Sequence, residues 1–196
     1  MILNHLWGIY THPKEEWHVI ERRHEGFKFS LSHILIISLI PALMAYFSAV
    51  YFGWSIGVGD RIHLTHNEGL ILGIGLYFGL AIGVFALAYM IQWMSKTFDS
   101  NPTFTQALEI SAYAATPLFM VALAGFYPEL WFIMLVGLAG ISYSVYLLYT
   151  GVPIVMKIPE EEGFVYASSV VTVGLIFLVV MMVGSVIVGS WIFHPI

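Results

Sequence analysis

The side chains of this sequence that could bind a metal ion lie in a polar stretch between two long apolar ones. Asp60, His63, His66 and Glu68 are of the right ligand types, and the two histidines are three positions apart. Zinc requires three or four such ligands converging on one point. A histidine pair in an irregular loop is a weak signal for that geometry, and a solvated loop explains the pair better. The sequence therefore predicts neither a metal site nor a cofactor.

Polar side chains inside the apolar stretches form a second candidate site. They gather near the same end of three stretches: Glu109, Tyr113, Thr116, Ser142, Tyr146, Tyr149, Ser168 and Thr172. One interpretation is a polar crevice that could bind a lipid or a small solute. It is supported by Pro117, which cannot donate to the carbonyl of Tyr113 and should kink its helix. The alternative is that these groups bond between helices, or to their own backbone, and hold the bundle together.

Catalytic signatures are missing from the sequence. It has no nucleotide-binding glycine loop, no nucleophile elbow, no HExxH motif and no cysteine. No His, Asp, Lys or Arg lies in the middle of an apolar stretch, where ion-coupled transport and proton relays need such groups. We therefore predict that the protein is not an enzyme.

The composition identifies the elements that must position these residues. Of 196 residues, 59% are hydrophobic and 10% are charged, and the mean hydropathy is +0.86. Soluble domains carry about 25% charged residues, so a soluble protein is excluded, as is nucleic-acid binding by a basic surface. Five stretches reach the roughly 20 residues that cross a bilayer: 31–52, 68–94, 105–126, 128–151 and 165–193. The sequence predicts an all-α membrane protein, with a short cytoplasmic N-terminal segment (1–30) before one five-helix transmembrane bundle (31–196).

The basic residues predict the orientation of these five spans. Six of the seven Lys and Arg fall on the side of the N-terminus, and only Arg61 falls on the other. The positive-inside rule places the side with more Lys and Arg in the cytoplasm. We therefore expect a cytoplasmic N-terminus and an external C-terminus. Trp17 and Trp93 should then lie near the inner membrane interface.

The segment before the first span has a helical pattern. Leu3, Leu6, Trp7 and Tyr10 follow the spacing of an amphipathic helix, and Pro13 is suited to the first turn of a second helix. This second helix would have a narrow apolar edge that includes Trp17. Two arrangements fit: a helix pair that lies on the inner leaflet or docks a partner, and a fold-back over the cytoplasmic end of the bundle. The small apolar edge favours the fold-back.

Glycines in the second span follow a helical spacing. They occur at Gly69, Gly73, Gly75, Gly79 and Gly83. Small residues at this spacing let helix backbones approach closely. The second span should therefore pack at the centre of the bundle or across a homodimer interface, and we expect a homo-oligomer.

Three stretches resemble a known family: LWGIYTHPKEEW, AYAATPLFMVALAGFYPELW and YSVYLLYTGVPIVMKIPEEEGF. They are similar to the bacterial branch of the Yip (Ypt-interacting protein) domain family of inner-membrane proteins, with the best matches at 113–117 and 146–153. The resemblance covers nearly the whole chain and implies a five-span fold in the bacterial inner (plasma) membrane. Eukaryotic relatives act in vesicle traffic, bind Rab-type GTPases and associate with one another. That function is not carried over, because a bacterium has no such pathway and the family's long acidic N-terminal domain is missing here.

Two functions follow from these observations. The first is a non-enzymatic membrane-organising or adaptor protein that self-associates. The alternative is a protein that binds or transports lipid or a small solute through the cytoplasm-facing crevice. The expected partners are membrane lipid, a second copy of the chain and an unidentified cytoplasmic or membrane protein, with no nucleic acid.

Overall fold

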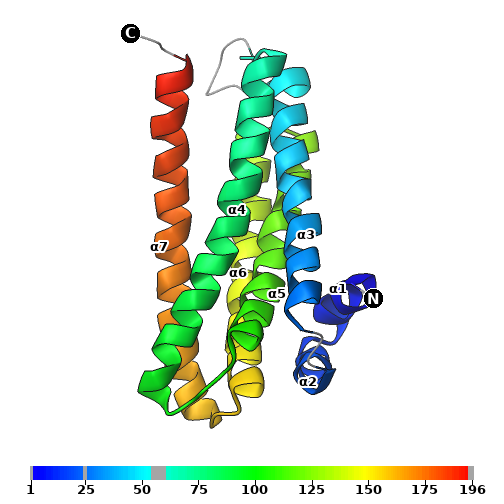
Figure 1. The fold of residues 1–196 in the computed structure, drawn as a ribbon. Coiled ribbons are helices and arrows are strands. Elements are labelled where there is room, and N and C mark those ends of the chain that lie inside the picture. The colour runs from blue at the N-terminus through cyan, green and yellow to red at the C-terminus, as the bar shows by residue number, and fades with distance from the viewer. Residues whose placement is uncertain (1, 24–25, 54–60, 194–196) are drawn as a thin grey trace.

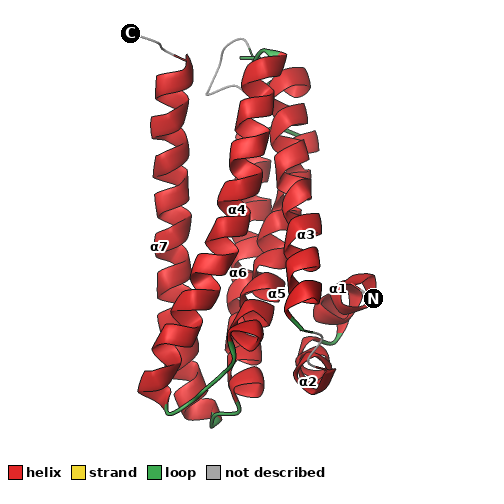
Figure 2. Cartoon of the chain, in the orientation of Figure 1, coloured by secondary structure: helices red, strands yellow, loops and turns green. Residues whose placement is uncertain are grey.

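The computed structural model describes residues 2–23, 26–53 and 61–193, and its long elements are all helices (Figures 1 and 2). In chain order these are α1 (Ile2–Thr11), α2 (Pro13–Arg23), α3 (Phe27–Phe47), α4 (His66–Ser95), α5 (Phe104–Val121), α6 (Leu130–Met156) and α7 (Glu160–Phe193). Short π or 3₁₀ turns extend α3 to Phe52, α4 to Phe98 and α5 to Phe126. Five helices, α3 to α7, are long and apolar enough to cross a membrane. The predicted all-α, five-span fold is confirmed.

The five long helices run alternately up and down (Figure 1). Two of them begin at capping boxes, in which the side chain of a threonine and that of the residue three positions later bond each other's backbone N–H. Thr65 and Glu68 start α4, and Thr103 and Gln106 start α5. The helices also begin earlier than the apolar stretches indicate, since α3 starts at Phe27 and α7 at Glu160.

Helix α5 lies at the centre of the bundle. Eleven of its 18 residues are buried, and it packs against α3, α4 and α6. Its buried residues include Ala107, Ser111 and Ala114, and such small side chains let neighbouring helices approach closely. The glycines of helix α4 suggested either a central position or a homodimer interface, and the structure leaves one face of α4 exposed that includes Ile74, Phe78 and Ile82.

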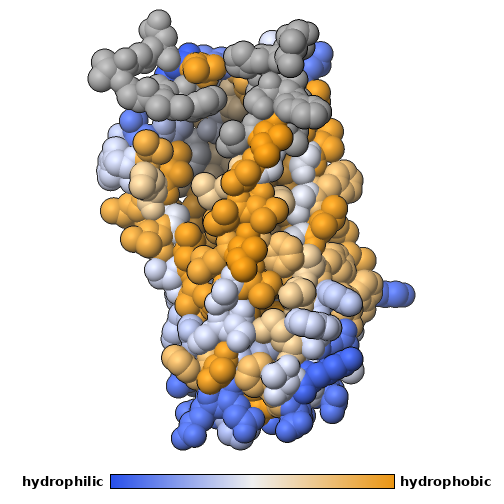
Figure 3. Space-filling model, turned by 90° about the vertical axis from the view of Figure 1, so that its left-hand side faces the viewer, coloured by the Kyte–Doolittle hydropathy of each residue, from blue (hydrophilic) through white to orange (hydrophobic). Residues whose placement is uncertain are grey.

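The outer surface of the bundle is apolar over most of its height. Figure 3 views the side on which α7 lies and shows hydrophobic side chains across the middle, with hydrophilic side chains gathered at the lower end. Exposed residues of α7 include Ile176, Val180 and Val183. In water this surface would drive aggregation, so it agrees with a protein that lies in a bilayer.

Helices α1 and α2 form an N-terminal hairpin against the lower end of the bundle (Figure 1). The predicted apolar edge of α2, Trp17 and Ile20, is buried, and α2 packs against α6. The arrangement is therefore the fold-back. Trp17 is fully buried, so it is not part of an interfacial aromatic belt as the sequence indicated, whereas Trp7 of α1 is 75% exposed.

Candidate functional site

Trp17 joins the N-terminal hairpin to the bundle. Its ring lies edge-on to Tyr113 of α5, with 6.1 Å between the ring centroids, and it also covers Gly151 of α6. A Cβ atom on residue 151 would lie 2.5 Å from Cε2 of Trp17. The glycine is therefore required at this position, because any side chain would take the space of the indole ring.

His5 and Glu16 join the two helices of the hairpin to each other. Nδ1 of His5 contacts Oε1 of Glu16, and His5 is buried. Gly8 makes this contact possible, since a side chain at that position would collide with the Glu16 carboxylate. The Glu16 side chain is 15% exposed, and a partly buried carboxylate gains from such a partner because an isolated charge is expensive to remove from water.

His33 joins α3 to α5. Its Nε2 lies 3.0 Å from Oγ1 of Thr116, and the Thr116 hydroxyl itself donates to the carbonyl of Ala112 at 3.0 Å. The threonine oxygen therefore accepts from His33, which places a proton on Nε2. Both side chains are buried.

Tyr113 lies at the centre of this group of side chains. Its ring centroid is 4.6 Å from that of His33 and 6.0 Å from that of His5. Glu109 precedes it by one helical turn and is equally buried. We call His5, Glu16, His33, Glu109, Tyr113 and Thr116 the polar cluster. Glu109, Tyr113 and Thr116 share one face of α5, and α3 and the hairpin cover this face.

Tyr149 and Ser168, two other predicted site residues, meet elsewhere, at the contact between α6 and α7. Their hydroxyl oxygens are 2.8 Å apart. Two further tyrosines act in the same way: Tyr143 donates to the carbonyl of Ile9 at 2.8 Å, and Tyr166 donates to the carbonyl of Ile91. The tyrosine hydroxyls therefore join helices to one another.

Ser142, Tyr146 and Thr172 point outward. The hydroxyls of Ser142 and Thr172 donate to backbone carbonyls one turn earlier in their own helices, and the side chain of Tyr146 is 42% exposed. Residues on the opposite face of α6, such as Ser144 and Leu147, are buried instead. The eight predicted lining residues thus have different surroundings, and the structure does not gather them into one crevice.

The glycines of α4 also divide into groups. A Cβ on Gly69 or Gly73 would touch α3, and one on Gly79 would lie 2.7 Å from the Met181 side chain of α7. Gly75 and Gly83 have open space around that position. Pro117 is buried inside α5, which continues beyond it to Val121.

The histidines between α3 and α4 have structural roles. His63 bonds to the carbonyl of Val50 at 3.2 Å, and His66 lies 3.0 Å from the Tyr46 hydroxyl. Glu68 is occupied by the capping box of α4, and Asp60 lies outside the described residues. In the described ranges, no three or more His, Cys, Asp and Glu side chains are grouped so that they could hold a metal ion.

Comparison with known proteins assigns the family. The Yip1 domain matches residues 7–181, which include the hairpin from Trp7 onward and all five long helices through most of α7. The chain belongs to the Yip1 domain family. The resemblance indicated by its sequence motifs is therefore confirmed.

Two relatives in this family are similar over almost their whole length. The inner membrane protein YohC of Escherichia coli strain K12 is 33% identical over 190 residues, which cover 96% of this chain and 97% of the relative. The same protein from Escherichia coli O6:H1 gives the same values. No solved structure gives a significant match. Neither the family description nor the names of these relatives indicate a catalytic role.

The sequence did not predict three members of the polar cluster of this Yip1 domain protein as site residues: His5, Glu16 and His33. His5 pairs with Glu16 because α1 and α2 fold against each other, and no local sequence pattern specifies the angle between these two helices. A signal for His33 is present, because Ser30, His33, Ile37 and Pro41 recur at helical spacing and are all buried. Polar residues on that face of an apolar helix indicate contact with another helix rather than with lipid.

The hairpin also sets the environment of Tyr10. Its ring stacks on Tyr143 of α6 with 5.5 Å between centroids. Burial, with a smaller electrostatic contribution from Tyr143, raises the pKa of Tyr10 to about 12. The phenol is therefore neutral at physiological pH and contributes an aromatic contact rather than a charge.

Proposed function

We propose that this Yip1 domain protein is a non-enzymatic organiser of the bacterial inner membrane, which self-associates in the bilayer and presents an adaptor surface to the cytoplasm. The main support is that polar side chains in its interior bond between helices. His33, Thr116 and Tyr149 bond to other helices, as expected for a scaffold rather than for a solute path. The inner-membrane location is supported by the name of the E. coli relative.

The adaptor surface is the end of the bundle that carries the hairpin. It consists of the exposed side of α2 and the turn between α6 and α7. Lys157 of that turn forms an ion pair with Glu21 of α2 at 2.7 Å, so the two parts lie side by side. The excess of Lys and Arg at this end supports a cytoplasmic position. A C-terminal reporter that is active only in the cytoplasm would contradict this orientation.

Self-association is proposed through the exposed face of α4. This face carries Ile71, Ile74, Phe78 and Ile82 around Gly75, where a Cβ would meet nothing. A second helix can approach most closely at a small residue, and close packing is what drives helix association in lipid. Gly75 is therefore the point at which we expect two copies to meet.

Cysteine cross-linking tests this proposal directly, because the natural chain contains no cysteine. Gly75→Cys should give disulfide-linked dimers when native membranes are oxidised. Leu138→Cys is the matched control, since Leu138 is an exposed apolar residue on α6, away from the proposed interface. Dimers at position 75 alone support the proposal. Monomers at position 75, or equal cross-linking at both positions, contradict it.

A further inference from the structure

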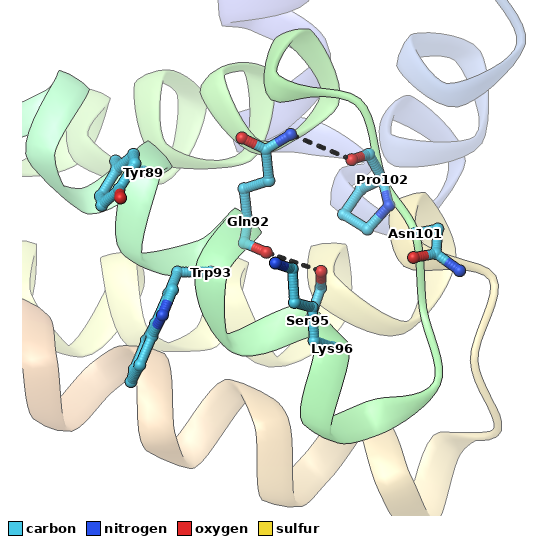
Figure 4. Close-up of a pocket in the computed structure, with 7 residues that line it drawn as sticks. All are labelled: Tyr89, Gln92, Trp93, Ser95, Lys96, Asn101 and Pro102. Atoms are coloured by element: carbon cyan, nitrogen blue, oxygen red, sulfur yellow. Dashed lines mark hydrogen bonds between the residues drawn. The ribbon is translucent and has the colours of Figure 1, made fainter.

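A cleft of about 340 Å³ opens where α4 ends and the loop to α5 begins (Figure 4). This end of α4 is at the same end of the bundle as the hairpin (Figure 1). The lining residues of the cleft come from the last two turns of α4 and from the loop: Tyr89, Gln92, Trp93, Ser95, Lys96, Asn101 and Pro102. Figure 4 shows the two aromatic side chains together on one side and Asn101 on the loop at the other. The cleft is separate from the polar cluster.

Two of the lining residues fix its shape. Nε2 of Gln92 donates to the carbonyl of Pro102 at 3.4 Å, which ties the loop to the helix. The Ser95 hydroxyl donates to the carbonyl of Gln92 at 2.7 Å, and Ser95 is buried. The loop side of the cleft is therefore linked to its helix side.

The remaining polar side chains of the cleft are donors that the fold does not use. Four residues make no side-chain hydrogen bond or ion pair within the described part of the chain: Tyr89, Trp93, Lys96 and Asn101. Lys96 is positively charged, and none of the seven lining residues is acidic. Asp99 belongs to the same loop but is exposed and outside the lining. This combination suits a ligand with a negative charge and several acceptor oxygens, such as a phosphate group.

The position of the cleft indicates that the phosphate belongs to a lipid headgroup. Beyond the proposed self-association face, the exposed side of α4 continues into Tyr89 and Trp93, which are 62% and 59% exposed. These residues recur at helical spacing and therefore lie on one side of the helix. Trp and Tyr prefer the level of the lipid headgroups. An acyl chain that packs beside Tyr89 and Trp93 would place its headgroup at the cleft.

We propose that the cleft binds the headgroup of an anionic phospholipid. Lys96 and Asn101 hold the phosphate, and the two aromatic side chains flank the glycerol and the upper part of the acyl chains. A headgroup with an ammonium group is disfavoured, because the lining offers no carboxylate to receive it. The proposal depends on the fold and not on the self-association described above.

Native mass spectrometry of the full chain in mild detergent tests the proposal. Phosphatidylglycerol should remain bound in preference to phosphatidylethanolamine. Lys96→Ala should weaken the phosphatidylglycerol adduct about fivefold, the usual effect of one interfacial cation. Lys157→Ala is the matched control, since Lys157 lies at the same end of the bundle but is paired with Glu21, and it should retain the adduct. Equal retention in the two variants would overturn the proposal.

Asn101→Asp provides a second variant with a distinct signature. It adds a carboxylate to the loop side of the cleft, so it should lose phosphatidylglycerol and bind phosphatidylethanolamine at least as well as the natural chain. An unchanged preference for the anionic lipid would contradict the assignment. Inorganic phosphate added to the natural chain should leave the lipid in place. Its displacement would show that the cleft takes a free anion and would overturn the lipid proposal.

Discussion

At the end that carries the N-terminal hairpin, the helices meet through buried polar and aromatic side chains, whereas at the opposite end their polar contacts are exposed. His33 and Tyr113 are almost wholly buried, while the ion pair of Arg61 with Glu129 at the other end has side chains that are 45% and 40% exposed. A buried polar group is expensive to leave without its partner, and an exposed ion pair contributes little. The difference indicates that the hairpin end determines how the helices are arranged.

The largest effect is expected from removal of the Trp17 ring. Trp17→Ala should weaken docking of the hairpin by about 3–5 kcal/mol, the usual cost of deleting a buried aromatic side chain. Such a loss corresponds to opening that is at least about a hundredfold more frequent. Hydrogen exchange of residues 13–23 in mild detergent measures this opening. Trp131→Ala, an exposed tryptophan on α6, should leave exchange in the hairpin unchanged, and equal exchange in both variants would contradict the comparison.

Smaller changes in stability are expected when either of two glycines of α6 is replaced by alanine, and the two changes should have opposite signs. Gly151→Ala would place a Cβ 2.5 Å from the Trp17 ring, so it should destabilise the protein by about 1–3 kcal/mol through overpacking. Gly137→Ala adds the same methyl group to the same helix in open space. It should stabilise the protein by about 0.5–1 kcal/mol, because alanine is the better helix former. Unfolding in mixed detergent and dodecyl sulfate measures both, and stabilisation by Gly151→Ala would show that Trp17 is not seated there.

The smallest effect is expected at the opposite end. Arg61→Ala breaks the 3.0 Å ion pair with Glu129 and should cost about 0.2–1 kcal/mol, as for other exposed pairs. The difference from the natural chain should shrink further in high salt, which screens exposed charges. The same unfolding assay at low and high salt measures it. A loss as large as that of Gly151→Ala would remove the distinction between the two ends.

Much of the fold could be predicted from the sequence, because the patterns that identify a span or the start of a helix lie within short stretches of the chain. A run of apolar residues long enough for a bilayer is sufficient to identify a span, and all five were found in this way. Pro13 at the start of α2 and the buried edge that includes Trp17 follow from helix start signals and spacing. These predictions require no knowledge of which helix lies beside which.

The arrangement of the helices was harder to predict, because it depends on residues far apart in the chain. The glycines of α4 indicated close packing but not which helix is central, and the alanine-rich α5 takes that position. Tyr113 is buried whereas Tyr146 is 42% exposed, because small residues such as Gly140 and Ser144 form the face of α6 that is buried. A hydroxyl in an apolar helix marks a contact with either another helix or its own backbone, and spacing alone does not distinguish the two.

The N-terminal hairpin has a consequence for the order of events during synthesis. Its contact with Tyr143 joins residues 134 positions apart, and the seat of Trp17 at Gly151 is as distant. The hairpin is made before both of these partners, so its docking cannot be completed until α6 has been made. Until then Trp17 can contact Tyr113 of α5 but not Gly151, so the site that receives its indole ring is incomplete.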